Sequence, residues 1–162
     1  MKLFTMILIL AALAVPALAQ REDLHNTLKA VYGFAPAVGT NNNAWTTPII
    51  DTSLYTGIEF YFITGTLSDS NATFAVTFAG GDVLDVTGTT ITDSAAITAA
   101  GNFIGTLTAA SFQYDDDSEI HKIGYVGTKK YIKVTVTPSG NDSGNIPLAC
   151  MAIGKPRVQP AN

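Results

Sequence analysis

The feature that most constrains the fold is residues 120–138, where apolar and polar side chains alternate along the chain. In its second half Ile132, Val134 and Val136 recur at every second position, a period that places them on one face of a β-strand. Their branched side chains favour a pleated, half-buried surface. Because Gly127, near the middle, can adopt positive φ without steric cost, the stretch predicts a β-hairpin.

Two further stretches predict strands. Residues 58–63 carry apolar side chains on both faces, which is typical of a central strand covered on both sides. Residues 73–78 alternate more regularly, with their aromatic and branched side chains on one face. The predicted core consists of Ile58, Phe60, Phe62, Phe74, Val76, Phe78, Ile123, Ile132, Val134 and Val136. Between these strands and the hairpin, Asp93 is expected to cap a short helix over residues 94–100, and Ile104 is expected to point into the core.

Length and composition indicate one all-β domain. A chain of 162 residues can bury a substantial core, and no repeat or change of composition suggests a second unit. Charged residues make up only 14% of the chain, which is low for a helical protein. Short strands separated by frequent turn residues predict a single antiparallel β-sandwich or jelly-roll-like domain of about seven to nine strands, with an extended N-terminal arm.

The domain organisation follows from three segments. Residues 1–19 resemble a signal peptide, because a lysine precedes an apolar run that ends in a small-x-small cleavage pattern. The alternatives are an uncleaved anchor or a later start, for example at Leu24. Residues 20–50 lack periodicity and are expected to form the extended arm. Residues 51–162 are expected to form the β-sandwich with a Pro-containing C-terminal tail. No membrane attachment is expected after signal cleavage.

Charge and cysteine usage exclude several classes of function. The net charge of −4 argues against nucleic-acid binding, which needs a concentrated basic surface. The lysines at 129, 130 and 133 are interpreted as a solvated face. The single cysteine, Cys150, lies in an apolar run and is interpreted as a small buried hydrophobe.

An acidic stretch at residues 115–119 is the strongest candidate for a metal site. In an extended segment Asp115, Asp117 and Glu119 face the same way and offer the oxygen ligands that calcium prefers. The EF-hand spacing is absent, and the alternative is a solvated turn. His121 follows this stretch and is interpreted as a packed strand histidine. No catalytic motif or phosphate loop occurs, so the sequence predicts a non-enzymatic protein without a cofactor.

Seven short segments occur in a characteristic order along the chain. They are residues 23–26, 35–37, 49–51 with 57–60, 63–69, 122–131 and 152–156. Together they resemble a family of small structural proteins encoded in the head-gene region of tailed bacteriophages and prophages, from about residue 23 to the C-terminus. The resemblance implies a virion structural protein that decorates or stabilises the capsid surface through many-copy contacts. Its expected partners are the major capsid protein or its own copies.

The chain ends are the predicted partner-binding segments. Aromatic groups anchor interfaces well, and the arm contains Tyr32, Phe34 and Trp45, while Pro156 stiffens the tail. The alternative is that the arm covers the domain's own sheet. A second functional hypothesis follows from residues 1–19: an exported, periplasmic or cell-surface β-sandwich that binds glycan or protein.

Overall fold

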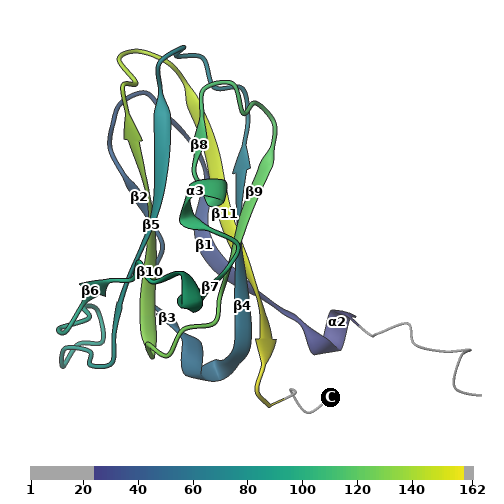
Figure 1. Ribbon diagram of the computed structural model, residues 1–162, viewed down its shortest axis with the longest axis vertical. Helices are drawn as coiled ribbons and strands as arrows, with labels where there is room; N and C mark the ends of the chain where they lie inside the picture. Colours follow the sequence, from purple (N-terminus) through teal and green to yellow (C-terminus); the bar gives the residue numbers. More distant parts are fainter. Residues whose placement is uncertain (1–23, 159–162) are drawn as a thin grey trace, which may run out of the picture.

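Two antiparallel β-sheets pack face to face and enclose an apolar core (Figure 1). The computed structural model describes residues 24–158. The signal-like segment 1–19, together with residues 20–23 and 159–162, lies outside the described residues. The predicted all-β sandwich is therefore confirmed for the part of the chain that is described.

Within residues 24–158, one sheet, sheet A, has five strands and the other, sheet B, has six. Sheet A contains, in spatial order, β1 (Lys29–Gly39), β11 (Ile146–Pro156), β4 (Tyr55–Thr64), β9 (Ile120–Tyr125) and β7 (Phe103–Ile104). Sheet B contains β2 (Trp45–Thr46), β10 (Tyr131–Ser139), β5 (Thr73–Gly81) and β6 (Ala95–Ala96), with β3 (Ile50–Asp51) beside β10 and β8 (Phe112–Gln113) beside β5. A short helix, α2 (Leu24–Thr27), precedes β1, and the helix α3 (Leu107–Ala110) and the 3-10 turns η2 (Thr52–Leu54) and η3 (Ala100–Asn102) lie between strands.

The core lies between the two sheets, where the inward side chains of both meet. All ten predicted core residues are buried, so the assignment of strand faces is confirmed. Alternating burial along β10 and β5 matches the period of two in their sequences. Aromatic rings from both sheets cross the middle of this layer, including those of Phe60 and Phe78.

The predicted hairpin is wrong. β9 pairs with β4 and β7 in sheet A, whereas β10 pairs with β5, β2 and β3 in sheet B. The segment between them crosses from one sheet to the other. Alternation defines which face of a strand is apolar, but two such faces can be buried by facing each other across a core as well as by lying side by side.

Gly127 allows the chain to pass between the two sheets here because it has no side chain. It is not among the described glycines with positive φ. A Cβ at this position would lie 2.6 Å from both Tyr125 Oη and Asn102 Oδ1, so a side chain would collide with them. The backbone N–H of Lys129 donates to the same Tyr125 hydroxyl at 3.0 Å, which fastens the far side of the turn.

The expected arm is part of the sandwich. β1 is an antiparallel edge strand on β11, with register shifts along its length, and β2 and β3 pair with β10. The described residues of the segment 20–50 are extended as expected, but they pair with the domain instead of standing apart from it. An unpaired segment of this length would leave its backbone donors and acceptors to water, whereas pairing on β11 satisfies them. The first residues of the expected C-terminal tail likewise belong to β11.

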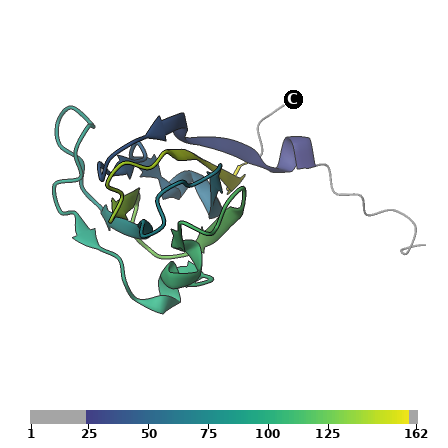
Figure 2. The same cartoon turned by 90° about the horizontal axis from the view of Figure 1, so that it is seen from above.

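The region between β5 and β8 differs from the sequence prediction. Asp93 caps no helix: its carboxylate accepts hydrogen bonds from the backbone N–H groups of Asp82 and Val83, closing the loop that follows β5. This loop projects from the sandwich on the side opposite α2 (Figures 1 and 2). Ile104 is 65% exposed, because it lies on the outer face of sheet A next to the buried Phe103.

Candidate functional site

The outer face of sheet A is largely apolar. β4 was predicted to be covered on both sides, but Ile63 is 38% exposed and Tyr61 is half-buried, so only its inner face is covered. Most outward positions of the neighbouring strands are also apolar, with Lys122 on β9 and Lys155 on β11 as exceptions. We call this set of outward residues the apolar face: Ala30, Tyr32 and Val38 of β1, Pro147, Ala149, Met151 and Ile153 of β11, Tyr61 and Ile63 of β4, Ile120 of β9, and Ile104 of β7.

Strand register makes the apolar face continuous. Met151 lies between Tyr32 on β1 and Tyr61 on β4, and Ile63 lies between Ala149 on β11 and Ile120 on β9. Residues directly opposite each other on antiparallel strands have Cβ atoms about 5 Å apart, so these side chains contact one another. The face therefore forms one patch across the sheet.

A depression lies at one end of the apolar face. Its cavity volume is about 440 Å³, and its lining includes Tyr61, Ile104 and Ile153 together with the charged Glu59 and Lys155. Gly124 contributes no side chain where β9 passes between β4 and β7, and a Cβ there would lie 3.2 Å from that of Ile104. Gly124 therefore allows Ile104 to pack closely over β9 at the edge of the depression.

Two charged side chains that point outward among the apolar residues are paired with one another. Lys122 Nζ lies 3.4 Å from Glu59 Oε1, and the hydroxyl of Tyr61 donates to Glu59 Oε2 at 2.6 Å. This hydrogen bond, together with burial and the negative charge of Glu59, raises the pKa of Tyr61. These two opposite charges offset each other, whereas Lys155, which also points outward from β11, adds a positive charge at the end of the face.

The outer face of sheet B is polar by contrast. Its outward positions on β5 and β10 include Thr73, Thr77, Lys133, Thr135, Thr137 and Ser139. Neighbouring hydroxyls interact across the strands, as Thr46 Oγ1 and Thr135 Oγ1 do at 3.0 Å. Water satisfies such groups well, whereas a contiguous apolar patch marks a surface that a partner covers. The two outer faces therefore differ in what they can bind.

The predicted partner-binding residues lie in different environments. Tyr32 is 64% exposed on the apolar face. Phe34 is 9% exposed and belongs to the core, which corrects its assignment as a partner contact. Trp45 is half-buried against the core, and Pro156 is half-buried at the end of β11. Sequence reasoning missed Ile63, Met151 and Ile153. For Ile63 the signal was the apolar character of both faces of residues 58–63, which from the sequence alone is interpreted as coverage on both sides.

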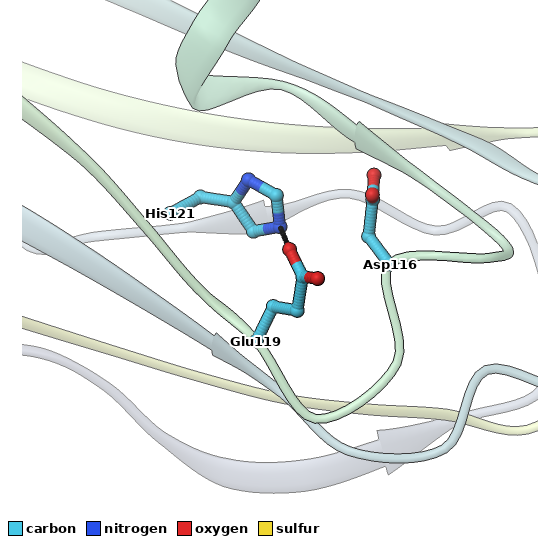
Figure 3. A group of neighbouring side chains, drawn as sticks. All are labelled: Asp116, Glu119 and His121. Carbon is cyan, nitrogen blue, oxygen red and sulfur yellow. Dashed lines mark ion pairs between the residues drawn. The ribbon is translucent and has the colours of Figure 1, made fainter.

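The acidic turn brings together a different set of ligands from the predicted one. Asp117 Oδ1 accepts a hydrogen bond from the backbone N–H of Leu67 at 2.6 Å, and Asp115 is exposed. The ligand atoms that gather belong to Asp116, Glu119 and His121, all within 4.8 Å of one another (Figure 3). The predicted calcium set of Asp115, Asp117 and Glu119 is not assembled, because Asp117 bonds to the loop after β4.

Other candidate reactive groups are engaged in packing or ion pairs. Cys150 is buried as predicted, and burial raises the pKa of its thiol to about 12. Lys129 Nζ lies 2.7 Å from Asp82 Oδ2, and the ammonium of Lys130 sits 4.9 Å from the centre of the Tyr131 ring. The lysine cluster is therefore partly paired.

Comparison with protein-family models found no match, and no curated protein sequence matches the chain. In the part of the chain that the structure describes, no helix is long and apolar enough to cross a membrane. The fold and surface define an all-β sandwich with one apolar and one polar outer face.

Proposed function

We propose that the protein is a non-enzymatic structural module that attaches in many copies to a protein lattice, and that this lattice is the capsid of a tailed bacteriophage. The apolar face carries the proposal. Exposed and half-buried apolar side chains gather on one sheet face, while the opposite face is rich in hydroxyl groups. Burying such a patch against another protein is favourable, because it removes apolar area from water.

The size of the apolar face fits a many-copy attachment. Strands about 4.8 Å apart that advance about 3.3 Å per residue give the face a footprint of roughly 600 Å². A stable contact buries about 800 Å² on each partner, with a spread of about 200 Å². One such contact therefore lies at the lower end of the range for a stable contact. Repeated contacts on a lattice add avidity without any strong individual site.

The occupant we assign to the apolar face is an apolar patch on a capsid subunit. Glu59 and Lys122 neutralise each other near the middle of the face, and the remaining charge, Lys155, lies at its end, so the centre of the face favours an apolar partner. The segment order that resembles phage head-region proteins supports the choice of a capsid. Cys150, whose thiol is buried and has a raised pKa, is unsuited to act as a nucleophile, which supports a non-enzymatic module.

Mass spectrometry of purified particles tests the lattice. The protein is expected in virions at many copies per particle, and its absence from them would overturn the capsid assignment. Binding of variants to particles tests the face. Ile63→Lys and Met151→Lys each place a charge in the apolar patch and should reduce co-sedimentation at least tenfold.

Thr137→Lys is the matched control, because Thr137 is exposed on β10 and the change adds the same charge to the outer face of sheet B, so the variant should co-sediment like the unaltered protein. All three variants should melt like the unaltered protein, since each site faces outward. Equal binding by all three would exclude the apolar face as the docking surface. Concentration-dependent dimers that Met151→Lys disrupts would instead identify a second copy as the occupant.

A second candidate is an exported β-sandwich that binds glycan or protein, and the signal-like residues 1–19 favour it. Sequencing of the mature N-terminus separates the two. A first residue of Gln20 supports export, whereas a start near Leu24 supports assembly inside the cell.

A further inference from the structure

Three metal-ligating side chains converge beside β9 (Figure 3). His121 projects from this strand, while Asp116 and Glu119 come from the turn that joins β8 to it. Their donor atoms lie within 4.8 Å of one another, and His121 Nε2 is 3.8 Å from Glu119 Oε2. The set combines one imidazole nitrogen with two carboxylates.

The imidazole nitrogen is shielded from water and lacks a hydrogen-bond partner among the described residues. His121 Nε2 is buried, and its distance to Glu119 is too long for a hydrogen bond. The ring is stacked on Phe112 with centroids 5.0 Å apart, so its orientation is fixed. A polar atom in such a position is costly unless a ligand satisfies it. Figure 3 shows that it points toward the carboxylate of Glu119.

The turn holds the two carboxylates differently. Asp116 Oδ2 accepts a hydrogen bond from the backbone N–H of Gln113 at 2.8 Å, which positions this side chain and leaves its other oxygen available. The backbone of Glu119 is fastened to Thr64 by hydrogen bonds in both directions. Its side chain is 57% exposed and can swing toward the other two. The arrangement thus has two positioned ligands and one mobile ligand.

We propose that Asp116, Glu119 and His121 bind one divalent transition-metal ion of the Zn²⁺ type. Zinc bonds to nitrogen and oxygen donors at about 2.0–2.2 Å, which puts tetrahedral donors roughly 3.4 Å apart. Rotation of the exposed Glu119 side chain shortens the distances from its carboxylate to the other two ligands from the present 4.8 Å or less toward this value. Calcium prefers six to eight oxygen ligands, so an imidazole with two carboxylates suits it poorly. The bound ion links the acidic turn to β9 and keeps a position open for water or a partner's ligand.

Equilibrium dialysis and thermal denaturation of the full chain, purified without a histidine tag, test the site. With Zn²⁺ alone as the probe, about one ion per chain is expected to bind and to raise Tm. Glu119→Gln should weaken binding at least tenfold and remove the rise in Tm. Because that side chain is exposed, the variant should fold normally without metal. His121→Gln should weaken binding similarly.

Asp115→Asn is the matched control. It neutralises an exposed carboxylate in the same turn and should bind Zn²⁺ like the unaltered chain. Absence of stoichiometric binding, or equal binding by Glu119→Gln, would overturn the proposal and leave only an ion pair between His121 and Glu119. A rise in Tm with Ca²⁺ but none with Zn²⁺ would overturn the choice of metal.

Discussion

The ring of Phe78 meets the ring of Phe60 edge-on, with centroids 5.3 Å apart, and this contact joins the two sheets. Phe60 lies on β4 in sheet A and Phe78 on β5 in sheet B. The Phe78 ring also lies 5.0 Å from that of Phe103 and stacks near that of Tyr125. Aromatic pairs in such geometries contribute beyond the area they bury, so Phe78 is central to how the sheets pack.

Replacing Phe78 with Ala should lower the free energy of unfolding by about 3–5 kcal/mol, because it removes a buried ring and leaves a cavity among three aromatic neighbours. Urea unfolding followed by circular dichroism measures the change. Val86→Ala is the control, since Val86 lies fully exposed in the loop after β5 and its loss should change stability by less than about 0.5 kcal/mol. A similar small change at Phe78 would contradict the packing described.

Side-chain facing could be predicted from the sequence, but strand pairing could not. The period of two placed Val134 and Ile123 in the core correctly, because burial acts on each strand separately. It did not reveal that β9 and β10 lie in different sheets. That choice depends on contacts distant in sequence, such as the register of Phe60 with Ile123 and of Phe78 with Val134. Short connections make hairpins common, but the short connection between β9 and β10 joins one sheet to the other.

Cys150 should be unreactive toward thiol reagents in the folded protein. With a pKa of about 12, roughly one thiol in ten thousand is ionised at about pH 8, and burial blocks access as well. Complete labelling is expected only in denaturant. Met151→Cys provides the matched control, because this neighbour faces outward on the apolar face and should label rapidly at one site per chain. Fast labelling of Cys150 itself would show that β11 opens readily.

Asp85 should make the loop after β5 sensitive to acid. Burial alone would raise the pKa of this carboxyl, but hydrogen bonds from Thr87, Thr89 and Thr90 outweigh it and lower the pKa from 3.8 to about 2. Since the folded-state value is the lower one, the stabilisation is present above about pH 3.8 and is lost as the pH falls toward about 2.

Amide hydrogen exchange measured by nuclear magnetic resonance tests this loop. The N–H groups of Thr89 and Thr90, which donate to Asp85, should lose protection between about pH 4 and pH 2. In Asp85→Asn the same amides should be less protected at neutral pH and should show little change on acidification. A carboxyl signal of Asp85 that titrates near 3.8 would show that the loop hydrogen bonds do not persist in solution.

The candidate sites were only partly accessible to sequence reasoning. The acidic turn was recognised, but alternation suggested Asp115 and Asp117 as ligands, and a tight turn does not follow strand periodicity. Hydrogen bonds to Leu67 and Gln113 direct Asp117 and Asp116 to different places. The apolar face was missed because Tyr61 and Ile63 suggested a strand covered on both sides. Apolar character alone does not distinguish a covered face from one that awaits a partner.

Substitutions at Phe34 and Tyr32, two nearby residues on β1, should affect stability and particle binding differently. Phe34 is 9% exposed and packs with the core, whereas Tyr32 is 64% exposed on the apolar face. Phe34→Ala should lower the free energy of unfolding by about 3 kcal/mol, because it removes a buried ring. Tyr32→Ala should change stability by no more than about 0.5 kcal/mol, although it removes the hydrogen bond from the Ala35 N–H to the Tyr32 hydroxyl and the packing of the ring beside Met151.

For particle binding, we expect Tyr32→Ala to have the larger effect and Phe34→Ala the smaller one. Tyr32→Ala should weaken particle binding, because it removes an exposed aromatic group from the proposed docking surface, whereas folded Phe34→Ala should bind nearly as well as the unaltered protein. Deleting residues 20–44 should abolish folding, since it removes β1 and leaves β11 without its edge partner. A soluble, folded deletion that has lost only particle binding would mean that β1 is an arm for assembly after all.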